Sequence, residues 1–567
     1  MNHIKSCILL FASLVVILPS TPARAQKHLI FLDGYLGWYY SMPPYLTEHH
    51  AEIEALPFSG FCVVGNVFTS YVMSAAPNNN VTYERVWNEV KSLQGVYRTK
   101  TENFLVIQVD WPGDFWDDAV WQRTTANFAA VARAAKNLGF KGILFDDEPY
   151  AGDLHHFANY MSNFKFPKKA DVQANPDNFA DWEVAESEHN RGDWVDYSCR
   201  IGGQDFNNSE DCSYRNPAHN FKEHMDKVAA RFKAIMEAME AEFPKITLLV
   251  LHGPATAHPN TNIDGHYIKP NSIFETNEYK GAMFLGFKQG LHSPATLHDM
   301  GEFYQYHTNQ QFQDAYQWRK HDIVSEQYNQ GLDDSYRWIV PEGDRATWSR
   351  DVQVGFMVSD YGRPHSLDQY NIPDACRSND VQARLDLALT RSDDYVIFYS
   401  DSSLSRQSPQ CANDNIGWLD VDGIAPEHPV SPQWREMMQG VYDSIHRVLD
   451  ISGVHVEEGS ISEHTARIIW DVSDYATGQV EYGITANYGQ FSTKETSFNY
   501  NQHGQLLHNL LAGSTYHYRV ISEDRLGNRA ASADYQFTTL GISVSSPVRP
   551  SIFPLIMPVL LQKQSVK

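Results

Sequence analysis

Length, composition and charge narrow the class of protein before any motif is considered. A chain of 567 residues that is 42% hydrophobic can bury a large core and a smaller second one, so roughly two to four globular domains are expected. The formal net charge of −24 disfavours nucleic acid and anionic lipid as partners. The aromatic content of 13% suits stacking on sugar rings, and equally suits aromatic-rich packing.

Residues 1–25 have the pattern of a signal peptide. A lysine precedes an apolar run, and Ala-Arg-Ala stands directly before Gln26 as a small-x-small cleavage site. We therefore expect an exported mature chain that is secreted, periplasmic or held at the cell surface.

Cysteine usage agrees with export. Four cysteines lie in polar, Asn/Asp/Ser-rich segments, and we predict the disulfides Cys199–Cys212 and Cys376–Cys411. Cys62 lies in the apolar "GFCVVGN" and is predicted to be a buried free thiol.

From residue 26 to about residue 450, short apolar runs alternate with longer helical patterns whose apolar residues recur every three or four positions. The alternation is typical of βα units on a parallel sheet, and it predicts a (β/α)8 barrel with insertions, with an open doubly wound sheet as the alternative. The longest insertion, about 152–220, follows the fourth strand. The eight predicted strands are 28–33, 60–66, 103–110, 142–147, 246–252, 281–287, 351–360 and 395–401.

A different pattern follows over residues 451–540, where short alternating strands are separated by turns. It predicts an all-β sandwich. Residues 541–567 include "SIFPLIMPVLL", which is too short and too interrupted by proline to span a bilayer, so we expect a disordered or sorting tail.

Polar residues stand at the ends of most predicted barrel strands. Each one alone is more often a structural hydrogen-bonding group, but catalytic and binding residues of such barrels gather at the carboxyl ends of the strands. Two tryptophans nearby can stack on sugar rings or cover the barrel rim. The resulting substrate-binding candidates are Asp33, Trp38, Asn66, Asp110, Trp111, Asp147, His252 and Asp401, and Asp360 is a reserve catalytic group.

The stretch "GILFDDEPY" (142–150) ends the fourth strand with three acids. Because alternate residues of a strand face opposite ways, Asp146 and Glu148 are predicted to point into the barrel mouth. Asp147 is predicted to face the helix layer or the amides of the following loop. Two neighbouring carboxyl groups can cleave a glycosidic bond, one as acid and one as nucleophile or stabiliser. The alternative is that the acids cap a helix or pair with basic residues.

Two resemblances add to this interpretation. The chain resembles (β/α)8 glycoside hydrolases that carry a fibronectin type III module, with Trp470 and Tyr516 at the positions of that module's core tryptophan and tyrosine corner. "GILFDDE" is similar to the fourth-strand signature of family-eighteen chitinases, with Leu144 at its first aspartate. This similarity implies Glu148 as the acid and Asp146 as the group that assists the substrate, and it implies a class of enzyme rather than one family.

Two alternatives stay open: a metal-dependent hydrolase on the same barrel, with His155, His156 and His252 as its plausible ligands, and a non-catalytic carbohydrate-binding or adhesive protein. The sequence contains no phosphate loop, dinucleotide fingerprint or zinc spacing. We therefore predict a cofactor-free hydrolase whose partner is a carbohydrate substrate, with cell-surface association through the C-terminal module or tail as a further expectation.

Overall fold

The structure of the chain is a computed structural model, and it forms two compact units, residues 1–447 with 526–528 and residues 448–525 with 529–567. The predicted signal peptide, most of the tail and most of the long insertion lie outside the described residues. Three short strands of the insertion are described by their backbone: β5 (Trp182–Val184), β6 (Tyr197–Ile201) and β7 (Gln204–Asp205). The other described residues are 27–34, 40–74, 80–109, 115–147, 221–254, 278–301, 306–327, 340–359, 378–400 and 432–542.

The first unit is built on a parallel sheet in which every neighbouring pair of strands is parallel. The strands are, in spatial order, β10 (Val352–Val354), β9 (Thr296–Asp299), β8 (Thr247–Val250), β4 (Gly142–Asp146), β3 (Phe104–Gln108), β2 (Gly60–Val63), β1 (His28–Asp33), β12 (Tyr395–Ser400) and β11 (Phe356–Ser359).

The sheet closes on itself at Gly355. β10 and β11 are the two halves of one chain segment on either side of this glycine, and β10 pairs with β9 while β11 pairs with β12. A Cβ at Gly355 would lie 2.9 Å from the Tyr395 backbone carbonyl oxygen and 2.4 Å from Met300 Sδ, so glycine suits this crossing. The predicted (β/α)8 barrel is therefore confirmed, and the open doubly wound sheet is wrong.

Seven of the eight predicted strands are confirmed, but the strand predicted at 281–287 is wrong. This segment belongs to helix α9 (Glu278–Gly290). Short apolar runs fit a buried helix as well as a strand. A Cβ at Gly286 would lie 2.3 Å from the Ala229 carbonyl oxygen of α8 (Phe221–Glu242), and one at Gly290 would lie 2.6 Å from the Lys233 carbonyl oxygen, so these two glycines allow α9 to pack closely on α8. The sixth strand is β9, whose polar "TLHD" gave no apolar signal.

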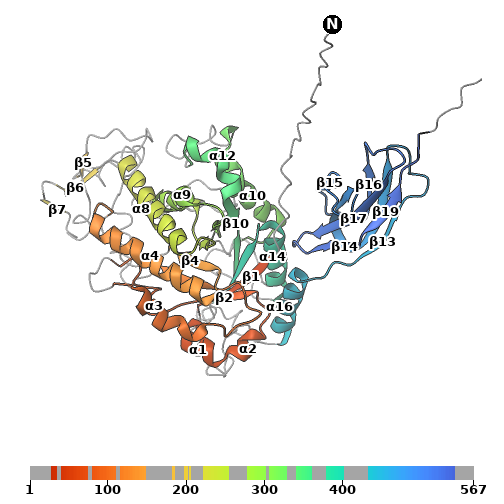
Figure 1. The fold of residues 1–567 in the computed structure, drawn as a ribbon. Helices are drawn as coiled ribbons and strands as arrows, with labels where there is room; N and C mark the ends of the chain where they lie inside the picture. Colours follow the sequence, from red (N-terminus) through yellow and green to blue (C-terminus); the bar gives the residue numbers. More distant parts are fainter. Residues whose placement is uncertain are drawn as a thin grey trace, which may run out of the picture. The chain divides into compact units, whose positions relative to one another are not determined.

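Alternate residues of the strands separate two buried layers. One face fills the barrel interior with a cluster that includes Ile30, Val106, Leu144, Leu249 and Ile397. Buried Cys62 belongs to this cluster and is a free thiol, as predicted. The other face packs on the helices, and α4 (Asp118–Leu138), α8 and α9 lie side by side along the outside of the strands (Figure 1).

The remaining helices of this unit surround the same barrel. Sequence signals fix their ends, as in α4, where the Asp117 side chain accepts hydrogen bonds from two first-turn amides and Gly139 ends the helix with φ 79°. They are α1 (Pro43–Glu48), α2 (His50–Glu54), α3 (Tyr83–Val90), η2 (Lys91–Leu93), α10 (Asn309–Lys320), η6 (Asp322–Val324), α12 (Glu342–Asp351), α14 (Ser378–Arg391) and α16 (Pro432–Ile445).

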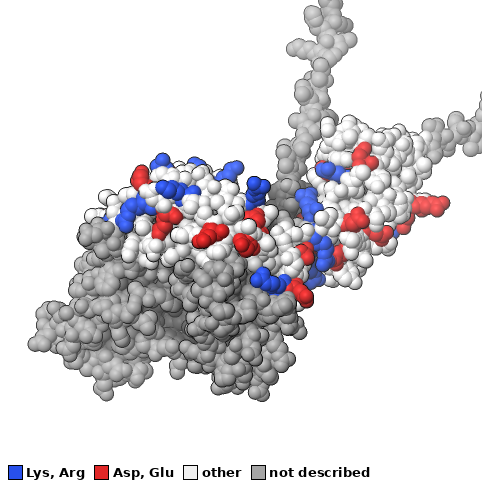
Figure 2. Space-filling view, turned by 90° about the horizontal axis from the view of Figure 1, so that it is seen from below, with Lys and Arg blue, Asp and Glu red and all other residues white. Residues whose placement is uncertain are grey.

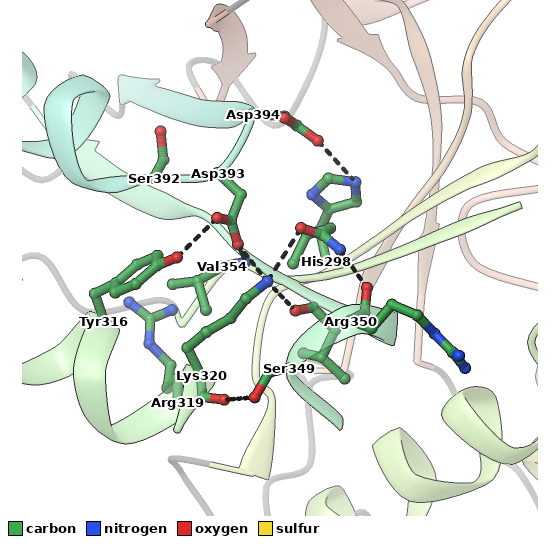
Figure 3. Close-up of polar contacts among 12 residues, drawn as sticks. His298, Tyr316, Arg319, Lys320, Ser349, Arg350, Val354, Ser392, Asp393 and Asp394 are labelled. Carbon is green, nitrogen blue, oxygen red and sulfur yellow. Dashed lines mark hydrogen bonds and ion pairs between the residues drawn. The ribbon is translucent and has the colours of Figure 1, made fainter. Parts of the chain in front are cut away.

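A buried polar cluster lies at the amino end of the barrel strands (Figure 3). The Lys320 ammonium donates to Asp393 at 2.8 Å, to the Val352 carbonyl at 2.7 Å and to the Gln353 side chain at 3.1 Å. Asp393 also accepts from the Val354 amide at 2.8 Å and from the Tyr316 hydroxyl at 2.9 Å. Each of these charges therefore meets several partners at once.

The same end of the barrel holds a second set of buried polar groups. The Tyr395 hydroxyl donates to Glu102 at 2.7 Å, and Lys141 pairs with the same carboxylate at 3.0 Å. His298 of β9 is fully buried, and burial lowers its pKa to about 3, so its ring is neutral.

The second unit is an antiparallel β-sandwich. The long strand β14 pairs through its first half with β13 and β16, and through its second half with β15 and β17. The strands are β13 (Ile451–Val456), β14 (Ala466–Gly483), β15 (Gln490–Phe491), β16 (Tyr500–Leu507), β17 (Thr515–Asp524), β18 (Arg529–Ala531) and β19 (Tyr535–Thr538).

The two marker residues expected of a fibronectin type III module are confirmed. Trp470 is fully buried, and its indole N–H donates to Ser522 at 3.0 Å. The Tyr516 hydroxyl accepts from the Leu511 amide at 2.9 Å, which is the geometry of a tyrosine corner. Within the described part of the chain, no helix has the length and apolar character that crossing a bilayer needs.

Candidate functional site

The carboxyl ends of the barrel strands bring some of the predicted site residues together. Among the candidates, the structure describes Asp33, Asn66, Asp146, Asp147 and His252. The others lie outside the described residues: Trp38, Asp110, Trp111, Glu148, Asp360, Asp401, Cys212, Cys376 and Cys411. Of Cys199 only the backbone, in β6, is described, so both disulfides stay predictions.

Asp146 is the last residue of β4 and is buried, with 4% of its surface exposed. Its position along the strand places it on the same face as Leu144, a member of the interior cluster. Gln108, the last residue of β3, donates from Nε2 to Asp146 Oδ2 at 3.2 Å. The predicted inward orientation of Asp146 is therefore confirmed, and one oxygen of its carboxylate has a fixed donor.

Asp147 lies on the opposite face of β4 and is also buried. Its Oδ1 accepts from the His252 backbone amide at 3.1 Å and lies 2.7 Å from His252 Nδ1. Burial by itself would raise the pKa of Asp147, but Lys280 and His252 outweigh that effect and lower it. The predicted orientation away from the barrel interior is confirmed, but the amide that Asp147 contacts belongs to the end of β8 and not to the loop that follows β4.

Asp299 ends β9 and is a buried acid that the sequence did not reveal. Its Oδ1 accepts from the Gly301 amide at 3.0 Å and lies 3.7 Å from Arg319 Nη1. Burial raises the pKa of Asp299, against the opposing effects of Arg319 and of the Gly301 amide. The stretch that encodes it is "TLHD", a strand of four residues between two helices that ends in an acid and lacks an apolar run.

Gly253 brings two strand ends together. A Cβ at this position would lie 2.3 Å from Asp299 Cγ, so only glycine lets the chain after β8 pass so close to the acid. Asp147, His252 and Asp299 thus come from the ends of three neighbouring strands, β4, β8 and β9, and form one buried group of interacting titratable side chains.

Two other predicted residues do not join this group. Asp33 is buried, but its place in β1 puts it on the face of Leu29 and Phe31, which packs outside the barrel interior. Asn66 is exposed, and its backbone amide donates to Glu89. Among the described candidates, the expectation that strand-end polar residues converge therefore holds for Asp147 and His252 and not for these two.

Two further features of the described residues concern metal ligands and surface charge. Among the described residues, no three His, Cys, Asp or Glu side chains are grouped so that they could hold a metal ion. Figure 2 shows acidic and basic side chains interspersed over the described part of the face in view.

No family model and no curated protein matches the chain. Several solved structures do. Chitinase ChiA74 from Bacillus thuringiensis aligns over 91% of this chain and 85% of that chain, at 11% identity and a TM-score of 0.28. β-1,4-D-mannanase from Cryptopygus antarcticus aligns over 73% and 90%, at 10% identity and a TM-score of 0.31.

The C-terminal module also has a structural neighbour. A fibronectin type III domain from the human KIAA0970 protein aligns over 19% of this chain and 85% of that chain, at 18% identity and a TM-score of 0.14. None of these likenesses bears on the site residues, whose roles rest on the contacts described above.

Proposed function

We propose that this protein is an exported glycoside hydrolase that cleaves glycosidic bonds of a poly- or oligosaccharide. The observation that carries the proposal is Asp146: a buried carboxylate at the carboxyl end of a closed β/α barrel, on the interior face and held by Gln108. Catalytic groups of this barrel class act at that end of the strands. A buried carboxylate facing the barrel mouth is the kind of group that glycosidic bond cleavage needs.

Glu148 is proposed as the general acid and base. It follows Asp146 by two positions, so a regular pleat carries both side chains to one side. In the reaction the protonated Glu148 gives its proton to the leaving glycosidic oxygen, and its carboxylate then activates water. Asp146 acts as nucleophile, stabiliser or substrate-assisting group, with Asp360 in reserve.

Gln108 has a clear part in this proposal. Its N–H donates to one oxygen of Asp146 and so fixes the orientation of the carboxylate toward the developing positive charge of the sugar. A fixed carboxylate costs no reorganisation when that charge forms. Sugar-binding roles are proposed for the aromatic and polar residues around the strand ends, above all Trp38 and Trp111.

The proposal also covers the location of the protein. The N-terminal segment fits export, and the C-terminal module or the tail would hold the enzyme near a cell surface or an insoluble glycan.

The test is a panel of polysaccharides incubated with the mature protein, with release of reducing ends as the readout. Glu148→Gln should lower hydrolysis by on the order of 10³-fold or more and leave glycan binding intact, because the amide keeps the size of the side chain but cannot transfer a proton. The matched control is Glu52→Gln, an exposed residue of α2, which should keep full activity.

Three outcomes contradict the proposal. If no glycan is cleaved, or if Glu148→Gln hydrolyses as fast as the unchanged protein, the assignment fails. Binding without turnover by the unchanged protein would instead favour the non-catalytic carbohydrate-binding alternative.

A further inference from the structure

Gln108 is the last residue of β3 and lies on the interior face at the carboxyl end of the barrel. Phe104 and Val106, which precede it on the same face of the strand, both belong to the interior cluster. The register of β3 and β4 places Gln108 beside Asp146. Gln108 is partly exposed, whereas only 4% of Asp146 is exposed. Of these two strand ends, Gln108 is therefore the one that solvent reaches more easily.

The backbone of Gln108 is fixed by the segment that follows β2. The Gln108 amide donates to the Thr69 carbonyl at 2.9 Å. The hydroxyl of buried Thr69 donates to the Val106 carbonyl at 2.9 Å and accepts from the Gly65 amide at 2.9 Å. Thr69 thus takes the place of a strand partner beside the end of β3, and the Gln108 side chain extends from a fixed point.

The contact with Asp146 determines which way the Gln108 carboxamide points. An ionised carboxylate only accepts hydrogen bonds, so the 3.2 Å contact with Asp146 Oδ2 requires Nε2 on that side and Oε1 on the other. Within the described part of the chain, Oε1 accepts no hydrogen bond and is not one of the buried side-chain atoms that lack a partner. This oxygen is therefore accessible at the barrel mouth.

The surroundings of Gln108 favour a neutral ligand group. Val64, Leu251 and Met300 directly follow β2, β8 and β9 and belong to the interior cluster, so apolar side chains stand at the same end of the barrel. The neighbouring Asp146 carboxylate disfavours an anionic group at this position. A carbonyl oxygen among apolar side chains suits a neutral donor such as a hydroxyl group.

We propose that Gln108 contacts the substrate: Nε2 holds Asp146, and Oε1 accepts a hydrogen bond from a hydroxyl group of the sugar unit bound beside that carboxylate. The inference rests on the proposed function, since it concerns the glycan bound at this end of the barrel. One side chain then joins recognition of a hydroxyl group to the orientation of the carboxylate. A sugar that lacks this hydroxyl leaves the acceptor unpaired and binds more weakly.

Two substitutions separate the two contacts of Gln108. Gln108→Met keeps the length of the side chain but removes both the donor and the acceptor. Gln108→Glu keeps an acceptor oxygen and removes the N–H that holds Asp146. We expect Gln108→Met to weaken oligosaccharide binding by about 3- to 10-fold, the loss of one hydrogen bond, and Gln108→Glu to weaken it by less. Both should lower kcat, because neither variant holds Asp146.

The chain contains a matched control for this glutamine. Gln317 of α10 donates from Nε2 to Asp322 Oδ1 at 2.9 Å, which is the same kind of contact on the exposed face of a helix. Gln317→Met should leave both oligosaccharide binding and kcat unchanged. Circular dichroism and urea unfolding of every variant separate loss of folding from loss of function.

Calorimetry in the Glu148→Gln background measures binding without turnover. The probes are soluble cello-, xylo-, manno- and chito-oligosaccharides. Deoxy analogues of the oligosaccharide that binds then test the hydroxyl contact. One of them should bind the Gln108→Met variant and the protein with Gln108 equally well, because each pair lacks the same hydrogen bond. If every analogue distinguishes the two proteins, Oε1 meets no sugar hydroxyl and the inference is wrong.

The two proposals fail in different ways. If the unchanged protein hydrolyses glycan and folded Gln108→Met binds oligosaccharide as tightly, or if Gln108→Met and Gln108→Glu weaken binding equally, the contact through Oε1 is wrong and the hydrolase stands. If glycan binds without turnover and Gln108→Met alone weakens binding, the hydrolase is wrong and the inference stands. If the protein binds none of the oligosaccharides and cleaves no glycan, both are overturned.

Discussion

The two ends of the barrel both bury charged side chains, but the ends differ in how many hydrogen-bond and ion-pair partners these side chains have. At the amino end, Lys320 and Asp393 each meet three partners, which come from α10, β10 and the segment between α14 and β12. At the carboxyl end, Asp147 Oδ2 is buried and finds no hydrogen-bond partner among the residues that the structure describes, and the pKa of Asp299 is raised by its burial.

Under the proposed function, the difference separates an end that holds the barrel together from an end that does chemistry. Buried charges with several partners stabilise a fold only as a complete set, and removing one is costly. Incompletely paired acids are unfavourable for stability and are retained where a ligand or a proton uses them. Substitutions at the amino end should therefore change stability, and substitutions at the carboxyl end should change activity.

The largest effect is expected for Lys320→Met. It leaves the largely buried Asp393 carboxylate, whose side chain is 20% exposed, without its cation, and the free energy of unfolding should fall by about 2–4 kcal/mol. Urea denaturation measures this. The control is Lys233→Met, which removes an exposed pair with Glu237 at 3.8 Å and should cost no more than about 0.5 kcal/mol. An equally small effect of both substitutions would show that the amino-end cluster is not structural.

Asp146→Asn is the counterpart at the carboxyl end. The amide still accepts the Gln108 hydrogen bond, so stability should stay within about 1 kcal/mol of the unchanged protein, while kcat falls by on the order of 10²- to 10⁴-fold. Steady-state kinetics with the best substrate of the panel, beside urea denaturation, measure both quantities. A large loss of stability with normal kcat would show that Asp146 is a structural residue and not a catalytic one.

Tyr395→Phe should have a smaller effect than Lys320→Met. It removes one donor to the buried Glu102 carboxylate, which keeps Lys141, so the expected loss is about 1–3 kcal/mol in the free energy of unfolding. Activity of the folded variant should be unchanged. A change in KM with no change in stability would place Tyr395 in the functional part of the barrel.

The smallest expected effect is a change in how the free energy of unfolding depends on pH between pH 7 and pH 5. His298 has a folded-state pKa of about 3 against an ordinary value of 6.5, so below pH 6.5 the unfolded chain binds a proton that the folded chain does not. Stability from this residue is therefore complete above pH 6.5 and is lost as the pH falls toward 3, by up to about 1.4 kcal/mol per pH unit.

His298→Asn should remove that part of the slope. Urea denaturation of both proteins at pH 7, 6 and 5 gives the difference, because the carboxylates contribute to both slopes alike. If the free energy of unfolding depends on pH with the same slope in both proteins, the His298 ring takes up its proton in the folded state as readily as in the unfolded chain, and the prediction is wrong.

Features encoded by neighbouring residues were visible in the sequence. The alternation of strands and helices predicted the barrel. The two-residue period of a strand predicted that the side chains of Asp146 and Asp147 point to opposite faces at the end of β4. The turn-separated strands, Trp470 and Tyr516 likewise gave the C-terminal module. Each depends on geometry that a few consecutive residues determine.

Features that depend on packing between distant residues were not visible. Whether 281–287 is a strand or a helix depends on its approach to α8, and the misplaced sixth strand hid Asp299 at its end. The pairing of Asp147 with His252 joins residues 105 positions apart. Parallel strands meet only through crossovers, so no local pattern records which strand ends become neighbours. The sequence by itself determined which way each acid of β4 points, and only the tertiary structure decided what each acid meets.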